Sequence, residues 1–147
     1  MPSAVSVDPI SVANRLRPVL LRLNRELRRE IHSLGVTGGQ VSLLNQIQKL
    51  PGTGVRELAT RERMSVPGMS KYAARLESAG LIRKTELADK RRVGLELTTE
   101  GERVLLSVKR RRTAWLAERL RGLDAGELKA VDAAVEPLLK LLEEVDA

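Results

Sequence analysis

Apolar residues recur every three or four positions from residue 10 to residue 34. This spacing places them on one stripe of a long helix, which comprises Ile10, Ala13, Leu16, Leu20, Leu23, Leu27, Ile31 and Leu34. Pro18 predicts a bend in that helix, and Gly35 predicts its C-terminal end. Residues Thr37–Gln40 have the pattern of a capping box and predict a second helix that reaches about Leu50.

Two short helices with a tight turn between them are predicted next. Residues Val55–Arg63 form the first, and Ser65 has the side chain of an N-cap for the second. Pro67 lies in the first turn of the second helix, where its missing N–H removes no hydrogen bond. Apolar residues at helical spacing predict one buried side of this helix, and small polar and basic residues occupy the other side.

The pattern then changes from helical to alternating. Residues Ile82–Glu86 and Val93–Leu97 predict two short strands, and the clean alternation of the second predicts one buried face. The segment between them is polar and basic, as expected for the tip of a hairpin. Two short helices followed by a hairpin with a basic tip form the pattern of a winged helix-turn-helix.

Two further helices are predicted after the hairpin. Thr98 or Thr99 caps the first, with Thr99–Glu102 as a capping box, and Asp124 begins the second. The last helix has an apolar stripe that Pro137 interrupts. The stripes of the first and last helices are more apolar surface than one small winged domain can cover, which predicts a homodimer. Packing of the two stripes within one chain is the alternative.

These elements predict a mostly α-helical protein with a small β-hairpin wing, in the α+β class. We expect an N-terminal dimerisation helix over residues 1–36 and a winged helix-turn-helix module over residues 37–99. Within the module, the recognition helix is expected at about 65–79 and the wing at about 82–97. Residues 100–147 are expected to form a C-terminal linker and dimerisation helices.

The charge is distributed unevenly along the 147 residues. Lys and Arg number 26 and Asp and Glu number 19, for a formal net charge of +7. The last 25 residues hold two lysines and seven acids and carry −5, so the preceding 122 residues, with 24 basic and 12 acidic side chains, carry +12. A positive body of this size attracts a polyanion by counterion release. A solvated, arginine-rich surface is the alternative interpretation.

The composition excludes several kinds of protein. Without cysteine the chain has no disulfide, no cysteine zinc site and no thiol redox sensor, and its single histidine cannot form a metal cluster by itself. We therefore expect no metal and no cofactor. The usual nucleotide-binding and hydrolase motifs are missing, so we do not expect an enzyme. No apolar run approaches the ~20 residues of a membrane span, and no signal peptide is evident, which predicts a cytoplasmic protein with no membrane partner.

Double-stranded DNA is the partner that this pattern favours. A helix fits the major groove, and a basic ribbon can follow the adjacent minor groove, where the negative potential attracts arginine. The residues predicted to face DNA are Ser65, Pro67, Gly68, Ser70, Lys71 and Arg75 on the second short helix, and Asp89, Lys90, Arg91 and Arg92 at the hairpin tip. A charge-assisted hydrogen bond from Asp89 is expected to orient Arg91. An ordinary solvated helix face and a polar turn are the alternatives.

Three segments around the predicted wing resemble those of MarR-type transcriptional regulators. They are Gly80–Arg83, Asp89–Arg91 and Leu97–Gly101, and the resemblance in element order covers nearly the whole chain. It implies an obligate homodimer that reads a pseudo-palindromic operator through successive major grooves, most often as a repressor, with Arg91 in the minor groove. Gly68 departs from the family, which often has a hydroxyl or a larger polar side chain there.

The same resemblance implies that a small, often aromatic or phenolic, anion binds between the dimer helices and the winged module and changes DNA affinity. The residues assign no effector and no effector site. An architectural DNA-binding protein, or a winged helix used for protein contact, is the alternative function, with no ligand response.

Overall fold

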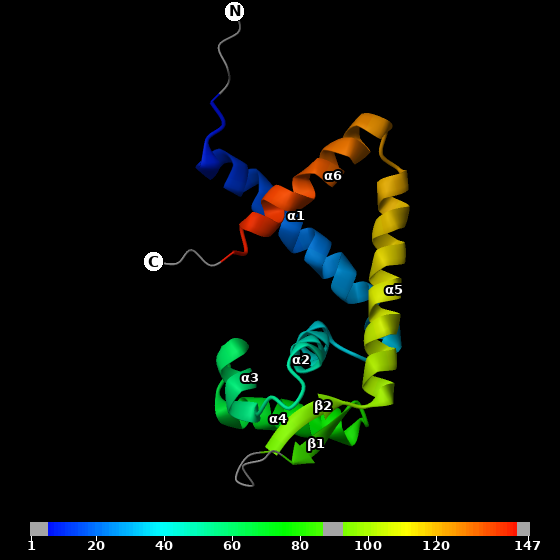
Figure 1. Ribbon diagram of the computed structural model, residues 1–147. Helices are drawn as coiled ribbons and strands as arrows, with labels where there is room; N and C mark the ends of the chain where they lie inside the picture. The colour runs from blue at the N-terminus through cyan, green and yellow to red at the C-terminus, as the bar shows by residue number, and fades with distance from the viewer. Residues whose placement is uncertain (1–5, 87–92, 144–147) are drawn as a thin grey trace, which may run out of the picture. The chain divides into compact units, whose positions relative to one another are not determined.

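The computed structural model describes residues 6–86 and 93–143 of the chain. Every predicted helix and strand is present in it (Figure 1). The elements, in chain order, are α1 (Pro9–Glu30), the 3-10 turn η1 (His32–Leu34), α2 (Gly38–Lys49), α3 (Val55–Arg61), α4 (Val66–Ser78), β1 (Ile82–Glu86), β2 (Val93–Leu97), α5 (Thr99–Arg121) and α6 (Ala125–Lys140). In the part of the chain described, no helix is both long enough and apolar enough for a membrane span.

The chain divides into two compact units, Met1–Arg112 and Thr113–Ala147, and α5 runs from the first into the second. The first unit contains one hydrophobic core. Its largest fully buried side chains come from the residue that follows α1, from α2, α3 and α4, and from both strands: Ile31, Val41, Leu44, Ile47, Leu58, Met69, Leu76, Ile82 and Leu95. The first half of α5 adds Leu105 and Val108 to this core.

The first helix ends earlier than the apolar stripe predicts. The α-helix stops at Glu30, and the chain continues through η1 with tighter bonds, from Leu34 N–H to Ile31 O at 3.0 Å and from Gly35 N–H to His32 O at 3.2 Å. Gly35 then takes a left-handed conformation with φ +75°. A 3-10 turn keeps neighbours three apart in contact, so the apolar spacing persists although the helix type changes. The capping box of α2 is confirmed, with Thr37 Oγ1 accepting from Gln40 N–H at 3.1 Å.

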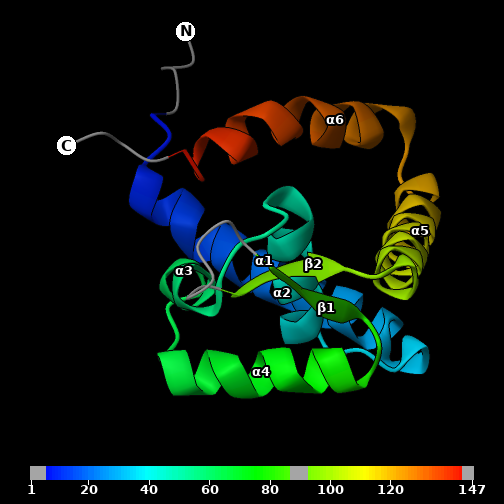
Figure 2. The same cartoon turned by 60° about the horizontal axis from the view of Figure 1, so that its bottom comes forward.

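The two strands have the predicted bounds and pair antiparallel, from Ile82 opposite Leu97 to Glu86 opposite Val93 (Figure 2). The other edge of β2 pairs with the loop before α3, where Leu95 N–H donates to Thr53 O at 2.8 Å. The backbones come so close that a Cβ on Gly94 would lie 2.5 Å from Gly52 O. Strand β2 is therefore hydrogen-bonded at both of its edges, to β1 on one side and to the loop before α3 on the other.

The end of α4, the end of β2 and the start of α5 meet at Thr98. Thr98 Oγ1 accepts from Gly101 N–H at 3.0 Å and donates to Gly80 O at 2.5 Å. Thr98 rather than Thr99 therefore caps α5. A Cβ on Gly101 would lie 2.1 Å from Leu81 O, so only glycine allows the first turn of α5 to meet the turn between α4 and β1.

The second unit contains the end of α5 and α6. Asp124 caps α6 by accepting from Glu127 N–H at 2.8 Å, while the Glu127 carboxylate accepts from Asp124 N–H at 3.1 Å. The helix continues through Pro137 to Lys140, so this proline interrupts the apolar stripe without ending the helix. No residue of α6 is buried, which leaves its apolar stripe at the surface of the unit.

We expect Gly101→Ala to lower the free energy of unfolding by about 1–3 kcal/mol, because the added methyl forces α5 away from Leu81 O. Urea unfolding monitored by circular dichroism measures this change. Gly126→Ala is the matched control, since a Cβ there meets only Asp124 Oδ1 at 3.4 Å. Equal stability of the Gly101→Ala variant and the unaltered protein would show that this approach does not constrain the fold.

Candidate nucleic-acid interface

Helix α4 has one side fixed in the core and one side free. Met69, Ala73 and Leu76 recur at helical spacing and are buried. The helix begins at Ser65, whose Oγ accepts from Gly68 N–H at 3.1 Å. An apolar anchor and a satisfied N-terminus together hold α4 in one rotation about its axis.

The free side of α4 carries most of the residues predicted to face DNA. The exposed ones are Ser65, Pro67, Ser70, Lys71 and Arg75. Gly68 is only half-exposed, and a Cβ on it would lie 2.9 Å from Ser65 Oγ. Position 68 thus leaves room for the N-cap hydroxyl, a local role that sequence analysis did not identify. The predicted tip residues Asp89, Lys90, Arg91 and Arg92 lie outside the described residues.

Strand β1 adds two cations that the sequence reading missed. Arg83 is paired across the hairpin with Glu96, whereas Lys84 is exposed and forms no ion pair within the described ranges. The period of two in a strand was a signal for Arg83 only, because it places Arg83 on the face opposite Ile82 and Lys84 on the same face as Ile82. The charge of Arg83 is therefore offset by Glu96, whereas no described side chain offsets the charge of Lys84.

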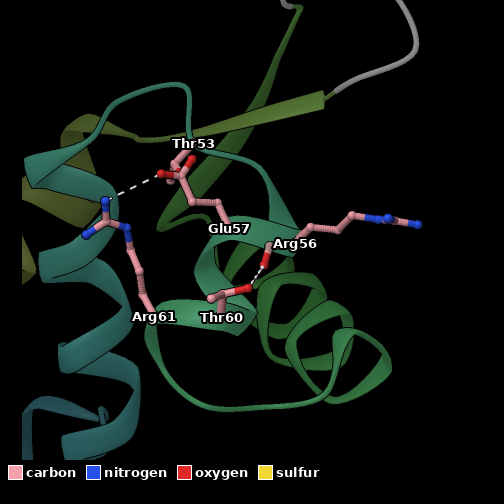
Figure 3. Close-up of polar contacts among 5 residues, drawn as sticks. All are labelled: Thr53, Arg56, Glu57, Thr60 and Arg61. Carbon is pink, nitrogen blue, oxygen red and sulfur yellow. Dashed lines mark hydrogen bonds and ion pairs between the residues drawn. The ribbon is translucent and has the colours of Figure 1, made fainter.

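Helix α3 also carries, within the described part of the chain, one paired and one unpaired arginine around a single glutamate (Figure 3). Glu57 accepts from the Thr53 hydroxyl at 3.1 Å and pairs with Arg61 at 3.4 Å. Arg56 extends away from this group into solvent. Only Arg56 of these side chains remains available for an external anion, and the sequence reading did not single it out.

A second basic cluster lies where α5 meets the end of α1. Arg112 follows Leu105 and Val108 on the buried side of α5 and is itself half-buried. Its Nε is buried and has no hydrogen-bond partner among residues 6–86 and 93–143. Burial, and next the positive charge of Arg28, lower the pKa of Arg112 from its ordinary value. Its neighbour Arg111 is paired with Glu30 at 3.9 Å.

The sequence has a run of four basic residues at 109–112, and the run alone does not show which side chains face inward and which face outward. The spacing of Arg112 from Leu105 and Val108, seven and four residues, was the signal that could have found it. Among the described residues no group of three or more His, Cys, Asp or Glu side chains could hold a metal ion.

Comparisons with known proteins agree on one family. The model of the MarR family matches residues 34–92. An HTH-type transcriptional regulator of Mycobacterium bovis, Mb0904, is 31% identical over 134 residues, which cover 90% of this chain and 94% of the relative.

Solved structures give the same result. A putative transcriptional regulator from Pseudomonas aeruginosa is 32% identical, with a TM-score of 0.77 over 93% of this chain and 96% of the other. A MepR mutant from S. aureus bound to an oligodeoxyribonucleotide shares the fold, with 20% identity and a TM-score of 0.68 over 90% of this chain and 98% of the other. The chain therefore belongs to the MarR family of winged-helix, DNA-binding transcriptional regulators.

Proposed function

We propose that this protein is a homodimeric repressor that binds a pseudo-palindromic operator and releases it when a small organic anion binds. The observation that carries the proposal is the division of α4 into an apolar side held in the core and a polar, basic side exposed along its length. An exposed helix of this kind fits the major groove, where its N-terminal residues reach the base edges.

In the proposed complex the exposed side of α4 lies in the major groove. Ser65, Pro67, Gly68 and Ser70 approach the DNA from the first turns, and Lys71 and Arg75 follow one turn apart. The hairpin tip, with Arg91 in the minor groove and Asp89, Lys90 and Arg92 beside it, completes the interface as the family resemblance implies. The DNA-bound structure of the MepR mutant, which has the same fold, supports this use of the module.

We expect Lys71→Ala and Arg75→Ala each to weaken operator binding about tenfold or more, because each removes a cation from the groove-facing side of α4. The operator is first selected from a random pool of duplexes, and affinity is then measured by fluorescence anisotropy at physiological salt. Lys129→Ala, which removes a cation of α6, is the matched control and should bind as the unaltered protein does.

The selection also distinguishes the alternatives. An architectural protein would bind operator and random duplex alike, whereas a specific regulator prefers its operator by about 10³-fold or more. A winged helix used for protein contact would bind neither duplex. Either of these results would contradict the proposed function.

The homodimer is proposed from the apolar surfaces of α1 and α6. No residue of either helix is buried in its own unit, although both have apolar stripes. On α1, Leu20 is 45% exposed, and on α6, Val135 is 49% exposed. Exposed apolar stripes of this length mark protein interfaces, and a second copy of the chain would cover both by two-fold symmetry.

We expect Leu20→Glu to convert the dimer to a monomer, because the new carboxylate would lose its water in the interface. Light scattering at micromolar concentration should give about twice the chain mass before the change and about one chain mass after it. Val66→Glu is the matched control, since Val66 has a similar exposure of 42% but lies on α4. A monomer before any change would contradict the dimer.

The ligand response is proposed from Arg112 and Arg28. Two guanidinium groups that repel each other, one of them half-buried with an unpartnered Nε, favour a bound anion. A carboxylate would accept from that Nε and offset the repulsion between the two cations. The aromatic or phenolic anions that the family resemblance implies have such a carboxylate or phenolate group.

We expect salicylate to quench the fluorescence of Trp115, the single tryptophan, which lies one turn from Arg112 on α5. Arg112→Gln should abolish the saturable quenching, because the guanidinium that binds the carboxylate is removed. Arg110→Gln, which changes an exposed arginine of the same helix, should leave it unchanged. Identical titrations for both variants would exclude Arg112 from the site.

A further inference from the structure

Arg63 has an unusual backbone conformation for an arginine. It is the one residue other than glycine with a positive φ, +53°, in the part of the chain that the structure describes. It follows the C-cap of α3, where Arg63 N–H donates to Thr60 O at 3.3 Å and Met64 N–H donates to Ala59 O at 2.8 Å. These two bonds form a Schellman motif, in which the left-handed position is usually glycine.

The end of α4 shows the same motif with the usual residue. Gly80 N–H donates to Glu77 O at 2.9 Å, Leu81 N–H donates to Leu76 O at 3.0 Å, and Gly80 has φ +77°. The chain therefore uses glycine at one of these two equivalent positions and arginine at the other. Because a Cβ is disfavoured in this conformation, the backbone alone would select glycine at position 63.

The side chain of Arg63 makes no described contact that would offset the strain of its backbone conformation. It is exposed and forms no ion pair or side-chain hydrogen bond with any described residue. Its nearest acidic neighbour in sequence, Glu62, is held by the Ser42 hydroxyl at 3.2 Å. Arg61 differs, since Glu57 pairs with it at 3.4 Å. A strained, uncompensated cation favours a role outside the fold itself.

The position of Arg63 indicates that role. It lies two residues before Ser65, the N-cap of α4, and next to the exposed start of that helix. A guanidinium here would flank the groove-facing side of α4, at the level of its first turn. Side chains at the edge of a recognition helix contact the sugar-phosphate backbone more often than the bases.

We propose that Arg63 contacts a DNA phosphate and increases the affinity of the module for any duplex, at the expense of backbone strain in the turn before the recognition helix. The inference rests on the proposed DNA-binding function of α4. Through this phosphate contact, Arg63 sets the affinity for DNA and its salt dependence but not the sequence preference.

The test measures affinity for a random-sequence duplex of about three helical turns, ~30 base pairs, as a function of salt, and thermal unfolding in parallel. Arg63→Gln removes the charge and keeps the Cβ, Arg63→Gly removes both, and Arg63→Lys keeps both. Arg29→Gln, which removes an α1 cation paired with Glu26 at 3.6 Å, controls for the change in net charge.

We expect Arg63→Gln and Arg63→Gly each to reduce the slope of log affinity against log salt by about 0.9 for each subunit bound. We expect only Arg63→Gly to raise the melting temperature, by about 3 °C, because glycine relieves the strain. Arg63→Lys and Arg29→Gln should keep the original slope.

An unchanged slope for Arg63→Gln, with DNA binding by the unaltered protein intact, would overturn the role of Arg63 and leave the proposed function standing. Failure of the unaltered protein to bind any duplex would overturn both. A melting temperature that does not rise in Arg63→Gly would show that the turn is not strained. The left-handed backbone of position 63 would then no longer argue for a role of the arginine outside the fold.

Discussion

The structure depends on one close approach, between Gly101 at the start of α5 and the carbonyl oxygen of Leu81. A side chain at position 101 would meet that oxygen at 2.1 Å. The Thr98 hydroxyl bonds to both sides of the same junction, at Gly80 O and Gly101 N–H. The end of α4, the start of the hairpin and the start of α5 therefore move as one piece, since each is bonded to the others through backbone atoms.

Much of this arrangement could be predicted from the sequence, because the capping residues and the spacing of the apolar residues indicated the same helices and strands. The bounds of β2 follow from its clean alternation beside a polar segment, and the start of α4 follows from the Ser65–Pro67 pair. The exposed side of α4 could be predicted for the same reason: its buried residues repeat at helical spacing, so the residues between them face outward.

The rest depended on geometry that residue types do not encode. The apolar spacing of residues 31–34 is the same in a 3-10 turn as in an α-helix, so the change of helix type after Glu30 left no signal. Thr98 and Thr99 are equally good N-caps by type, and only the position of the Gly80 carbonyl selects Thr98. The left-handed conformation of Arg63 is set by the Schellman bonds and contradicts the propensity of arginine.

Helix α5 connects the junction at Gly101 to the basic pair of Arg112 and Arg28. Eleven residues of helix, about 16 Å at 1.5 Å per residue, separate Gly101 from Arg112. An anion between the two guanidinium groups would offset the burial and the repulsion that lower the pKa of Arg112, so it would bind best to the arrangement that holds them together. Such a ligand can change DNA affinity only if that arrangement differs between the free and DNA-bound protein. Because α5 begins on the turn that ends α4, any shift of α5 at Arg112 that reaches its first turn must also move α4.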